Sequence, residues 1–350
     1  MKHTNILLPG PGKRRGGNKL LILPSLFALL FCSVCACSTG EAAGRILGVS
    51  AEAPVFLGAR AVSAGKITFQ FSLPVRVITL NLSPGIEVAS VEGGNTVTVH
   101  LAEERAGGER LTVDLLVEDE AGNTLNVLIP LRTRNDRIPP LLLTELRTEY
   151  SKPKAEFVEF KTLEAGNLGA LRLFIAGYYK QPLVYEFSPV EVGAGEYILI
   201  HLRTPEGGTA DETGSDLNLS GGTDAVAGAR DFWISGSEKL LHKTDAVYFL
   251  DQDDRVIDGV MLSENADPWW NKEYLAAAAD FLFKEGAWAS PEGNIPGPAD
   301  AVITAPVKTA MTRSVSRDES MEDTNRAADW FVTATSGITP GKPNKARPGL

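Results

Sequence analysis

The sequence predicts an all-β protein of two tandem β-sandwich domains, the second of which carries a helical insertion. Between residues 45 and 136, apolar and polar residues alternate in short stretches that turn residues separate, as expected for half-buried strands. A helical pattern is present in one later stretch, residues 271–284, which is too little to build a core of helices. Both observations favour sheets as the framework of the fold.

Length and composition are those of an ordinary globular protein. The 350 residues have room for two domains and additional segments, and 43% of them are hydrophobic and 22% charged. The cysteines are Cys32, Cys35 and Cys37, all near the N-terminus. The body of the protein can therefore contain neither a disulfide framework nor a cysteine metal site.

The net charge narrows the class of partner. Lys and Arg number 34 against 44 Asp and Glu, a formal charge of −10. The first 36 residues contain five Lys or Arg and no acid, so without them the charge is 29 − 44 = −15. Such an acidic protein argues against nucleic acid as a partner, since phosphates bind Lys and Arg. It also argues against docking on an anionic lipid surface by charge alone.

Residues 1–37 are predicted to be a targeting segment rather than part of the fold. A basic stretch precedes the apolar run Leu20–Val34, which is too short, and too interrupted by Pro24, for a membrane-spanning helix. Val34–Cys37 is similar to a bacterial lipobox, with an aliphatic residue at −3, a small residue at −1 and the cysteine that becomes acylated. Cys35 at −2 departs from the usual pattern.

The lipobox resemblance implies a lipoprotein whose Cys37 carries acyl chains such as palmitate. Two or more chains anchor a protein stably to a membrane, and residues 38–44 would form a flexible tether. Ser38 gives no inner-membrane retention signal, which favours the outer membrane. The alternatives are plain secretion with an unmodified Cys37 thiol, and an uncleaved anchor helix.

The first domain, residues 45–136, is predicted to be a β-sandwich. The strand Phe71–Val75 and the turn Val117–Asn123 resemble bacterial immunoglobulin-like domains, which implies a spacer or, in some cases, a ligand binder. Two prolines should make the linker that follows, residues 135–140, semi-rigid. The expected strands are Ile67–Phe71, Val97–Leu101, Leu111–Val117 and Asn126–Leu131.

The end of the second domain reads as the closing edge of a β domain. Residues 323–325 (Asp-Thr-Asn) should form an Asx-type turn, and residues 329–332 an apolar strand. Arg317 is the expected partner of Asp323 or Asp329, because its planar guanidinium satisfies a carboxylate and turn carbonyls together.

The amino-acid sequence of this segment resembles the C-terminal half of bacterial lamin tail domains. The resemblance covers residues 139–346 and implies a β-sandwich that acts as a binding or scaffolding module. The motif residues are Arg317, Asp323, Asn325, Asp329, Pro340, Gly341 and Asn344. Upstream stretches similar to the family's strands, in the same order, are Leu141–Leu146, Glu156–Phe160, Ala170–Ile175, Val192–Ile200 and the hairpin Asp245–Asp258.

Two insertions interrupt the family pattern. Residues 203–230 are rich in Gly, Thr, Asp and Ser and are predicted to form a mobile loop. Residues 263–313 contain the predicted helix, with Asp267 as its cap, Pro268 in its first turn and Gly286 as its stop.

The helical insertion is rich in aromatic residues and is the best candidate for a binding surface. One interpretation is an aromatic platform for a carbohydrate or a peptide; the other is that the helix uses aromatics to pack on the sandwich. Adjacent tryptophans cannot share one helix face, so one of the pair should be partly exposed. The candidate binding residues are Trp269, Trp270, Tyr274 and Trp288.

Other polar clusters carry weaker signals. The carboxylates Asp251, Asp253, Asp254 and Asp258 could hold Ca²⁺, but they lack the glycine and the distal glutamate of a calcium loop and are more simply a hairpin turn. The carboxylates at 145, 156 and 159 are expected on the solvent face of strands, and the histidines at 201 and 242 are isolated in the sequence. No catalytic motif is present, so we expect neither an enzyme nor a cofactor.

The sequence therefore predicts a membrane-anchored envelope lipoprotein that binds or scaffolds a protein or carbohydrate partner without catalysis. One alternative is a purely structural spacer of the envelope. Another is an accessory subunit of a secreted hydrolase or nuclease, since tail domains of this kind accompany such enzymes on longer chains.

Overall fold

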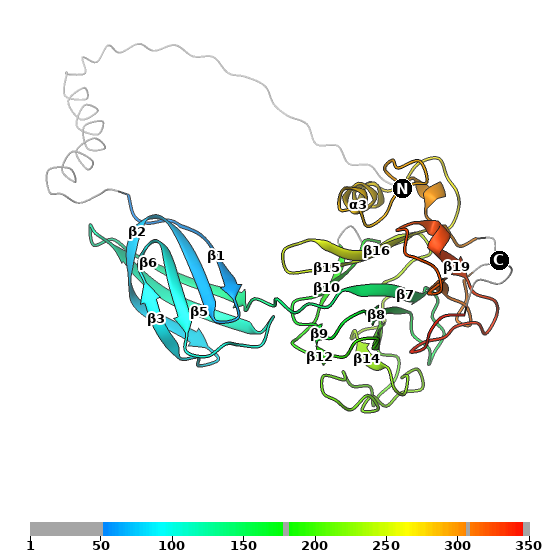
Figure 1. Cartoon of the computed structure of the whole chain (residues 1–350), viewed down its shortest axis with the longest axis horizontal. Coiled ribbons are helices and arrows are strands. Elements are labelled where there is room, and N and C mark those ends of the chain that lie inside the picture. Colours follow the sequence, from blue (N-terminus) through cyan, green and yellow to red (C-terminus); the bar gives the residue numbers. More distant parts are fainter. Residues whose placement is uncertain (1–51, 178–181, 306–308, 346–350) are drawn as a thin grey trace, which may run out of the picture.

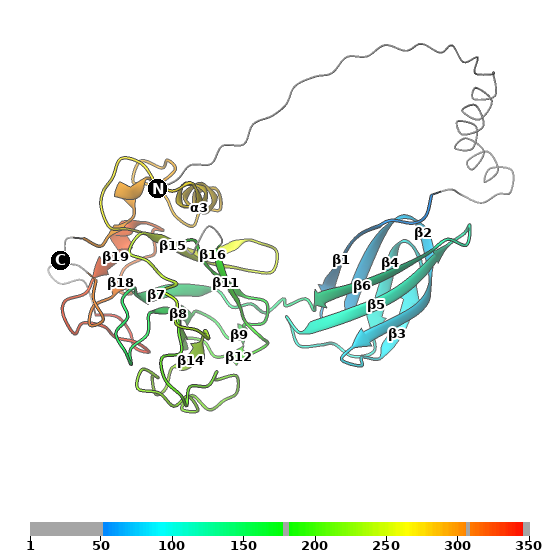
Figure 2. The ribbon, with the colours of Figure 1, turned by 180° about the vertical axis from the view of Figure 1, so that it is seen from behind.

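The computed structural model describes residues 52–177, 182–305 and 309–345. Its described residues form mostly β-strands, with one α-helix among them, which confirms the predicted all-β class. Figures 1 and 2 show two β-rich units joined by a short linker. The predicted signal peptide, the lipidation residue Cys37 and the tether 38–44 lie outside the described residues.

The first unit is a sandwich-like domain of antiparallel strands. The order of hydrogen-bonded neighbours is β3-β4-β2-β5-β6, and β1 also pairs with β2. The strands are β1 (Phe56–Ser63), β2 (Lys66–Ser83), β3 (Val88–Glu92), β4 (Gly94–Leu101), β5 (Arg110–Asp119) and β6 (Thr124–Arg132).

Strand β2 joins both halves of this domain. Its first part, Lys66–Gln70, lies between β1 and β4, while Val75–Ser83 pairs with β5, so the sheet turns around a core that contains Phe69. The expected strand 67–71 is only the start of β2. Pro74, which normally ends a strand, lies instead where the register with β4 shifts. The other three expected strands are confirmed as parts of β4, β5 and β6.

The second unit packs a five-stranded sheet against a six-stranded one. The ring of Phe160 lies 4.7 Å from that of Phe249 across the shared core, measured between centroids. The first sheet has the order β11 (Leu183–Glu186), β10 (Arg172–Ile175), β15 (Asp245–Leu250), β16 (Val256–Ser263), β17 (Val302–Ile303). The second has the order β14 (Arg230–Trp233), β13 (Tyr197–His201), β8 (Phe157–Thr162), β7 (Leu141–Arg147), β18 (Val315–Arg317), β19 (Trp330–Val332), and β9 (Gly166–Asn167) pairs separately with β12 (Glu191–Val192).

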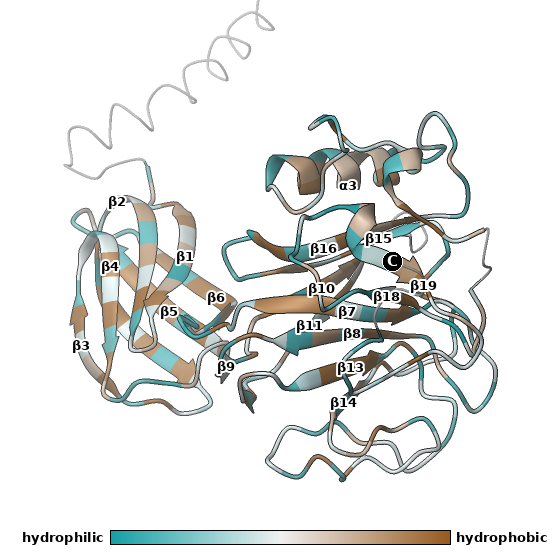
Figure 3. Cartoon of the chain, turned by 45° about the vertical axis from the view of Figure 1, so that its right-hand side comes forward, coloured by the Kyte–Doolittle hydropathy of each residue, from teal (hydrophilic) through white to brown (hydrophobic). Residues whose placement is uncertain are grey.

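Helix α3 (Glu273–Lys284) covers the outer side of β15 and β16. Its buried residues include Leu275 and Leu282, and Figure 3 shows the helix above β15 and β16. The expected stop is consistent with Gly286, whose φ is +73°. The expected start is wrong, because Lys272 is the N-cap. Asp267 and Pro268 lie outside the helix, in a segment that the Trp270 indole ties to the Pro296 carbonyl (2.9 Å).

Arg317 is buried at the centre of the closing edge. Its Nη1 donates to Asp323 (2.6 Å), as one of the two expected pairings, and its Nε donates to the Leu143 carbonyl (2.7 Å). Asp329 instead accepts from the backbone N–H and hydroxyl of Thr324. The Asx turn is confirmed, since the Asp323 carboxylate accepts from the Asn325 N–H (3.0 Å).

The remaining motif residues lie over β7. Asn344 donates from Nδ2 to the carbonyls of Thr144 and Arg317, and Gly341 donates its N–H to Glu159 (2.6 Å). Pro340 lies between the residues that make these contacts. The segment 339–344 therefore ends the ladder by covering the outer face of the central strands.

Three glutamates expected on a solvent face are buried instead. Glu145 accepts from the hydroxyls of Ser314 and Ser316, Glu159 accepts from Thr144 (2.6 Å), and Glu156 pairs with Arg203. Alternation along β8 places Glu159 on the outer face, and Glu145 lies opposite it because the register of β7 shifts after Leu143, whereas Glu156 precedes β8. Later segments of the chain cover these carboxylates. Burial raises the pKa of Glu145, and it raises the pKa of Glu159 well above the usual range, with the Glu145 charge adding to the effect.

The linker is fixed onto the second unit more firmly than its prolines alone would achieve. Asn135 is buried and donates from Nδ2 to the carbonyls of Asn167 (2.8 Å) and Gly169 (2.7 Å). Its own N–H donates to the Gln252 side chain (2.9 Å). Ion pairs between Arg134 and Asp253, and between Arg132 and Glu186, extend this contact on either side.

Candidate binding site

The four candidate aromatic residues have very different exposures. Trp269 is 73% exposed, whereas Trp270 is half-buried against the core. The expectation that one of this adjacent pair is exposed is confirmed. Trp288 is fully buried and donates from its indole to the Asp300 carbonyl (3.1 Å), so the assignment of Trp288 to a binding surface is wrong. Its size made it the anchor that packs the insertion onto the core.

Tyr274 lines a surface hollow of about 830 Å³ at the start of α3. One wall comes from the first residues of the helix and the other from the loop that precedes β15. Trp269 lies two residues before the first of these wall residues. The side chains that line the hollow include Asn271, Lys272, Glu273, Tyr274, Glu238, Lys239 and His242.

The hollow offers uncharged hydrogen-bonding groups at neutral pH. Burial lowers the pKa of His242, and the neighbouring Lys239 charge lowers it further, so the imidazole is neutral. Burial raises the pKa of Tyr274, so its phenol keeps the proton and donates. Together with the Asn271 amide, these groups can pair with hydroxyl and amide groups of a ligand. Trp269, which does not line the hollow, exposes the apolar face of its indole two residues before Asn271 in the sequence.

The acidic residues of the β15–β16 hairpin do not converge on one point. The Asp251 carboxylate accepts from the N–H of Asp253 (2.8 Å) and of Arg255 (3.0 Å), which confirms the hairpin turn. Asp254 pairs with an arginine of β10, and Asp258 is buried beside Arg317. Among residues 52–177, 182–305 and 309–345, no group of three His, Cys, Asp or Glu side chains is placed to hold a metal ion.

His201 is part of a buried polar cluster that sequence reasoning missed. Its Nε2 lies 2.8 Å from Asp231 Oδ1, and its ring stacks on Trp233 with centroids 3.8 Å apart. Asp224 lies nearby and pairs with Arg147. Asp224, Asp231 and Trp233 follow His201 by 23 to 32 residues, and Arg147 comes from another strand. No short sequence motif therefore predicts this cluster. The cluster attaches the insertion 203–230 to β13.

That insertion was expected to be mobile, but its contacts hold it. The Asp224 carboxylate accepts from the Ala155 N–H (2.8 Å), and Glu212 accepts from the Asp231 N–H (2.9 Å). Arg230 pairs with Glu196 and donates to the Gly214 carbonyl (2.7 Å). The segment is a loop, as expected, yet buried charged groups fix it to the six-stranded sheet.

Within the described part of the chain, no helix is both long and apolar enough to cross a membrane. The fold and the hollow define an all-β protein of two joined units, with a surface hollow at the start of an inserted helix. Residues 139–332, which span β7 to β19, match the family described as "TP_1001_2nd: protein second domain". Because this match covers more than half of the 350 residues, the chain belongs to that family.

Two individual proteins resemble the chain. A protein of Treponema pallidum (strain Nichols), described as uncharacterized, is 25% identical over 248 residues, which cover 68% of this chain. The chain thus spans 61% of the length of that relative. The crystal structure of the N-terminal part of the bacterial S-layer protein SbsC is 14% identical and matches 50% of this chain and 48% of its own, with a TM-score of 0.23. That likeness is too low to support an argument.

Proposed function

We propose that this protein is an exported bacterial lipoprotein whose second domain is a lamin-tail-like, non-catalytic binding and scaffolding module. Cys37 would carry the acyl anchor, and the outer membrane is the favoured location. The lipobox-like residues at 34–37 and the order of strand motifs in residues 139–346 support these assignments. The partner is a protein or a carbohydrate of the envelope or of a host.

The binding role rests on one observation, the exposure of Trp269, which in the sequence is two residues before Asn271 of the polar hollow. An indole that is 73% exposed keeps a large apolar area in water, and other aromatics of the same insertion pack inward. Trp269 is therefore not needed to hold the insertion in place. Tryptophan is also among the residues that most often dominate the affinity of an interface.

The groups around the hollow favour carbohydrate over an apolar peptide. Sugars present hydroxyl groups on one side and C–H groups on the other, so they pair with amide, carboxylate and phenol groups while they stack on an indole. Asn271, Glu273 and Tyr274 supply the first kind of contact, and Trp269 supplies the second.

The test compares wild-type protein with Trp269→Ala on arrayed glycans and on isolated cell-wall sacculi. We expect the substitution to weaken binding by about tenfold or more, equivalent to about 1.4 kcal/mol, without a change in thermal stability. The matched control is Leu128→Ala, which removes a side chain that is 68% exposed on β6 of the first unit. A Trp269→Ala variant that binds as tightly as wild type would contradict the assignment of Trp269 to the binding site.

The anchor and the location need separate measurements. Incorporation of labelled palmitate into wild-type protein, and its loss in Cys37→Ala, would support lipidation, whereas equal labelling would contradict it. Protease treatment of intact and of lysed cells then separates the two faces of the envelope. Cleavage on intact cells favours a surface partner, and protection until lysis favours a periplasmic one.

The structural spacer is a second candidate, and the interface between the units favours it. Asn135, Arg132 and Arg134 bind the first unit and the linker to the second at several points, as a rigid spacer requires. Cells that carry Trp269→Ala could behave like wild type while cells in which this interface is disrupted do not. That result would make the spacer the better proposal. Co-purification with a hydrolase or nuclease would instead favour an accessory subunit.

A further inference from the structure

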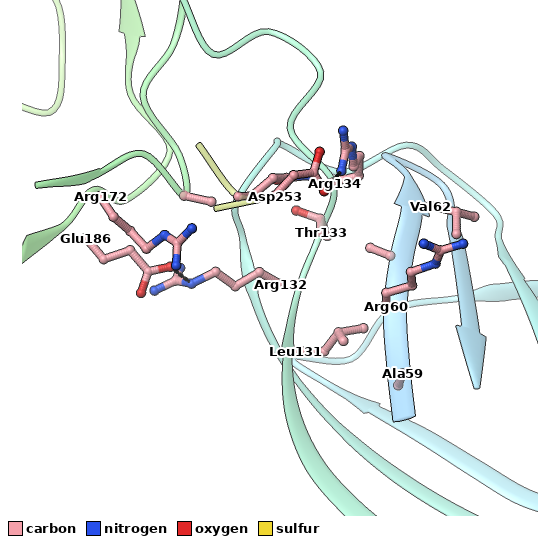
Figure 4. A pocket seen from close by; sticks show the side chains of 13 residues that line it. Ala59, Arg60, Val62, Leu131, Arg132, Thr133, Arg134, Arg172, Glu186 and Asp253 are labelled. Atoms are coloured by element: carbon pink, nitrogen blue, oxygen red, sulfur yellow. Dashed lines mark hydrogen bonds and ion pairs between the residues drawn. The ribbon is translucent and has the colours of Figure 1, made fainter. Parts of the chain in front are cut away.

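The hollow between the two units and the hollow beside α3 differ in how their charged groups are used. The first, of about 530 Å³, contains ion pairs between its own lining residues. Figure 4 shows Arg132 beside Glu186, with which it pairs, and Arg134 pairs with Asp253 at 2.7 Å. These charges are balanced within the fold. Behind the wall of the hollow beside α3, by contrast, lies a buried carboxylate that no basic side chain balances.

That carboxylate belongs to Asp245, the first residue of β15. The residue is 0% exposed, and within residues 52–177, 182–305 and 309–345 no Lys, Arg or His side chain forms an ion pair with it. Backbone N–H groups bond it instead. Its Oδ1 accepts from Gly177 (2.7 Å) and Ala246 (2.9 Å), and its Oδ2 accepts from His242 (3.0 Å). Without a fixed cation beside it, such a group can exist ionised or protonated in the folded protein.

Two of these donors belong to the lining of the α3 hollow. Gly177 follows β10 and His242 lies in the loop before β15, and both line the hollow. The Asp245 carboxylate therefore ties together two segments that are distant in the sequence. The approach is close, since a Cβ added at Gly177 would lie 2.5 Å from Asp245 Oδ2. A glycine at this position is what lets the carboxylate reach both segments.

The titratable groups that face Asp245 are neutral at pH 7. From α3, Tyr274 lies near enough that the Asp245 charge adds to the rise that burial causes in the pKa of this phenol. From the loop before β15 comes His242, whose imidazole pKa is lowered by burial and by the Lys239 charge. Neither group gives Asp245 a counter-charge.

The nearest lysines of the loop have another partner. Lys239 and Lys243 both lie 3.6 Å from the Glu149 carboxylate. On the β16 side the residue opposite Asp245 is Leu262, which carries no charge. The hydrogen bonds of Asp245 to backbone N–H groups are therefore what responds when its ionisation changes.

Protonation of Asp245 breaks one side of the tie. A carboxylic acid turns one of its oxygens into an O–H donor. Within the described residues Oδ1 accepts from two N–H groups and Oδ2 from one, so the proton displaces least on Oδ2, where it meets the His242 N–H. The ionised form keeps all three bonds, and hydrogen bonds to an ionised acceptor are about twice as strong as neutral ones.

We propose that Asp245 is a pH-responsive tie that regulates the α3 hollow: its ionised form joins Gly177 to His242 and fixes the wall, and its protonated form releases His242. This inference rests on the proposed function, because the hollow is the site proposed above for a carbohydrate. A wall that is fixed before binding loses less freedom on binding, so the ionised form should hold the ligand more tightly.

The change falls near neutral pH. Burial raises the pKa of Asp245 to about 7, although its backbone N–H partners oppose the rise. The tie is therefore mostly complete about one pH unit above this value and mostly broken about one unit below it. Ionisation still lowers the overall stability, because the charge is buried, so the firmer wall at higher pH coincides with a smaller free energy of unfolding.

The first test needs no ligand. The amide resonances of Gly177 and His242 are followed by NMR between about pH 5.5 and about pH 8.5 in full-length protein with isotope-labelled glycine and histidine. We expect both to shift with a midpoint of about 7 in wild type. The shift should be absent in Asp245→Asn, whose side chain has one acceptor oxygen at every pH and so resembles the neutral acid.

Asp251→Asn is the matched control for this titration. Asp251 also accepts backbone N–H bonds, from Asp253 (2.8 Å) and Arg255 (3.0 Å), but it lies just after the opposite end of β15. Its substitution should leave the shifts of Gly177 and His242 unchanged.

The second test measures binding of full-length protein to isolated cell-wall sacculi at about pH 6 and about pH 8. Between these values the ionised fraction of Asp245 rises from about a tenth to about nine tenths, so exclusive binding to the ionised form would strengthen affinity about tenfold. We expect at least about threefold in wild type and no change in Asp245→Asn. His242→Gln removes the imidazole but keeps the N–H that Asp245 accepts, so the pH dependence should remain whatever its affinity.

The two tests separate the tie from the proposed function. Amides of Gly177 and His242 that do not titrate near pH 7 in wild type would overturn the tie, and the wild-type titration decides this point even without the variant. The same pH dependence of binding in wild type and in Asp245→Asn would exclude a regulatory role for Asp245. Amides that titrate as expected in a protein that binds sacculi at neither pH would support the tie and contradict the proposed function of the hollow.

Discussion

Replacement of Arg317 by methionine tests whether a buried ion pair holds the second unit together. The guanidinium is 2% exposed and donates to Asp258 (3.1 Å), to Asp323 (2.6 Å) and to the Leu143 carbonyl (2.7 Å). It also lies over the Trp330 ring, 4.7 Å from its centroid. Methionine fills a comparable volume but donates nothing, so these acceptors lose a donor while they stay in place.

The expected magnitude follows from the groups that remain. Removal of one partner from a buried ion pair costs about 3–5 kcal/mol, and an unsatisfied buried carbonyl costs about 1–3 kcal/mol. Asp258 keeps the N–H donors of Leu143 and Gly259, so the two costs do not add in full. We expect Arg317→Met to lower the free energy of unfolding by about 4 kcal/mol, a large share of the roughly 5–15 kcal/mol typical of a domain.

Urea unfolding followed by tryptophan fluorescence measures this loss directly. All five tryptophans lie between residues 233 and 330, so the signal reports on the second unit alone. The control is Arg76→Met, which breaks an exposed pair with Glu118 and should cost about 0–1 kcal/mol. A loss below about 1 kcal/mol for Arg317→Met would refute the reasoning, because it would mean that the buried acceptors find other donors or water.

The same variant has a pH signature. Burial raises the pKa of Asp258 to about 6, although the Arg317 charge opposes this rise. The group therefore contributes stability that is fully present below its unfolded pKa of about 4 and is lost as pH rises through about 6. Without Arg317 the carboxylate is harder to ionise, so the cost of Arg317→Met should grow between about pH 5 and pH 8. A cost that does not change with pH would exclude Asp258 as the group left without a partner.

Three further predictions concern stability. Burial raises the pKa of Asp245 to about 7, so the unfolding free energy should fall as pH rises from about 4 to about 7, and Asp245→Asn should flatten that slope in urea titrations at several pH values. Trp288→Ala should cost about 3–5 kcal/mol, whereas Trp269→Ala should change stability by about 0.5 kcal/mol or less; similar losses in both would contradict the burial of Trp288. Gly341 has φ +74°, and an added Cβ would meet Val226 at 2.6 Å, so Gly341→Ala should cost about 1–3 kcal/mol by thermal melting.

Local pattern located several long strands, although it gave only the start of β2 and missed β1. Alternation located β4, β5 and β6, and the apolar stretches around an acidic turn located the β15–β16 hairpin, because each pattern is contained within the element itself. It failed for β9, β12 and β17, which have two residues each. A strand of two residues has no period of its own, and these strands form only because a partner strand is already in place.

The same limit explains the errors at side chains. Alternation gave the correct face for Glu159, but it reveals neither the register shift that turns Glu145 to the same face nor the return of residues 339–344 over that face. Because Trp269 and Trp270 are adjacent, the sequence predicted that one of them is exposed. The hydrogen bond of the Trp270 indole to the Pro296 carbonyl decides which one, and the sequence does not reveal that contact. The hollow beside α3 and the cluster at His201 depend on residues from separate segments, and no single stretch of sequence encodes them.

The cover over Glu145 and Glu159 has a consequence for biogenesis. Thr339 and Gly341 satisfy carboxylates that precede them by 194 and 182 residues, so the donors of these buried groups are among the last described residues to be synthesised. Contacts so distant in sequence slow folding, because a long loop must close before they form. The second unit therefore cannot finish folding on the ribosome until residues 339–344 have emerged. Any factor that holds this short segment would leave Glu145 and Glu159 without these donors and would delay the last step of folding.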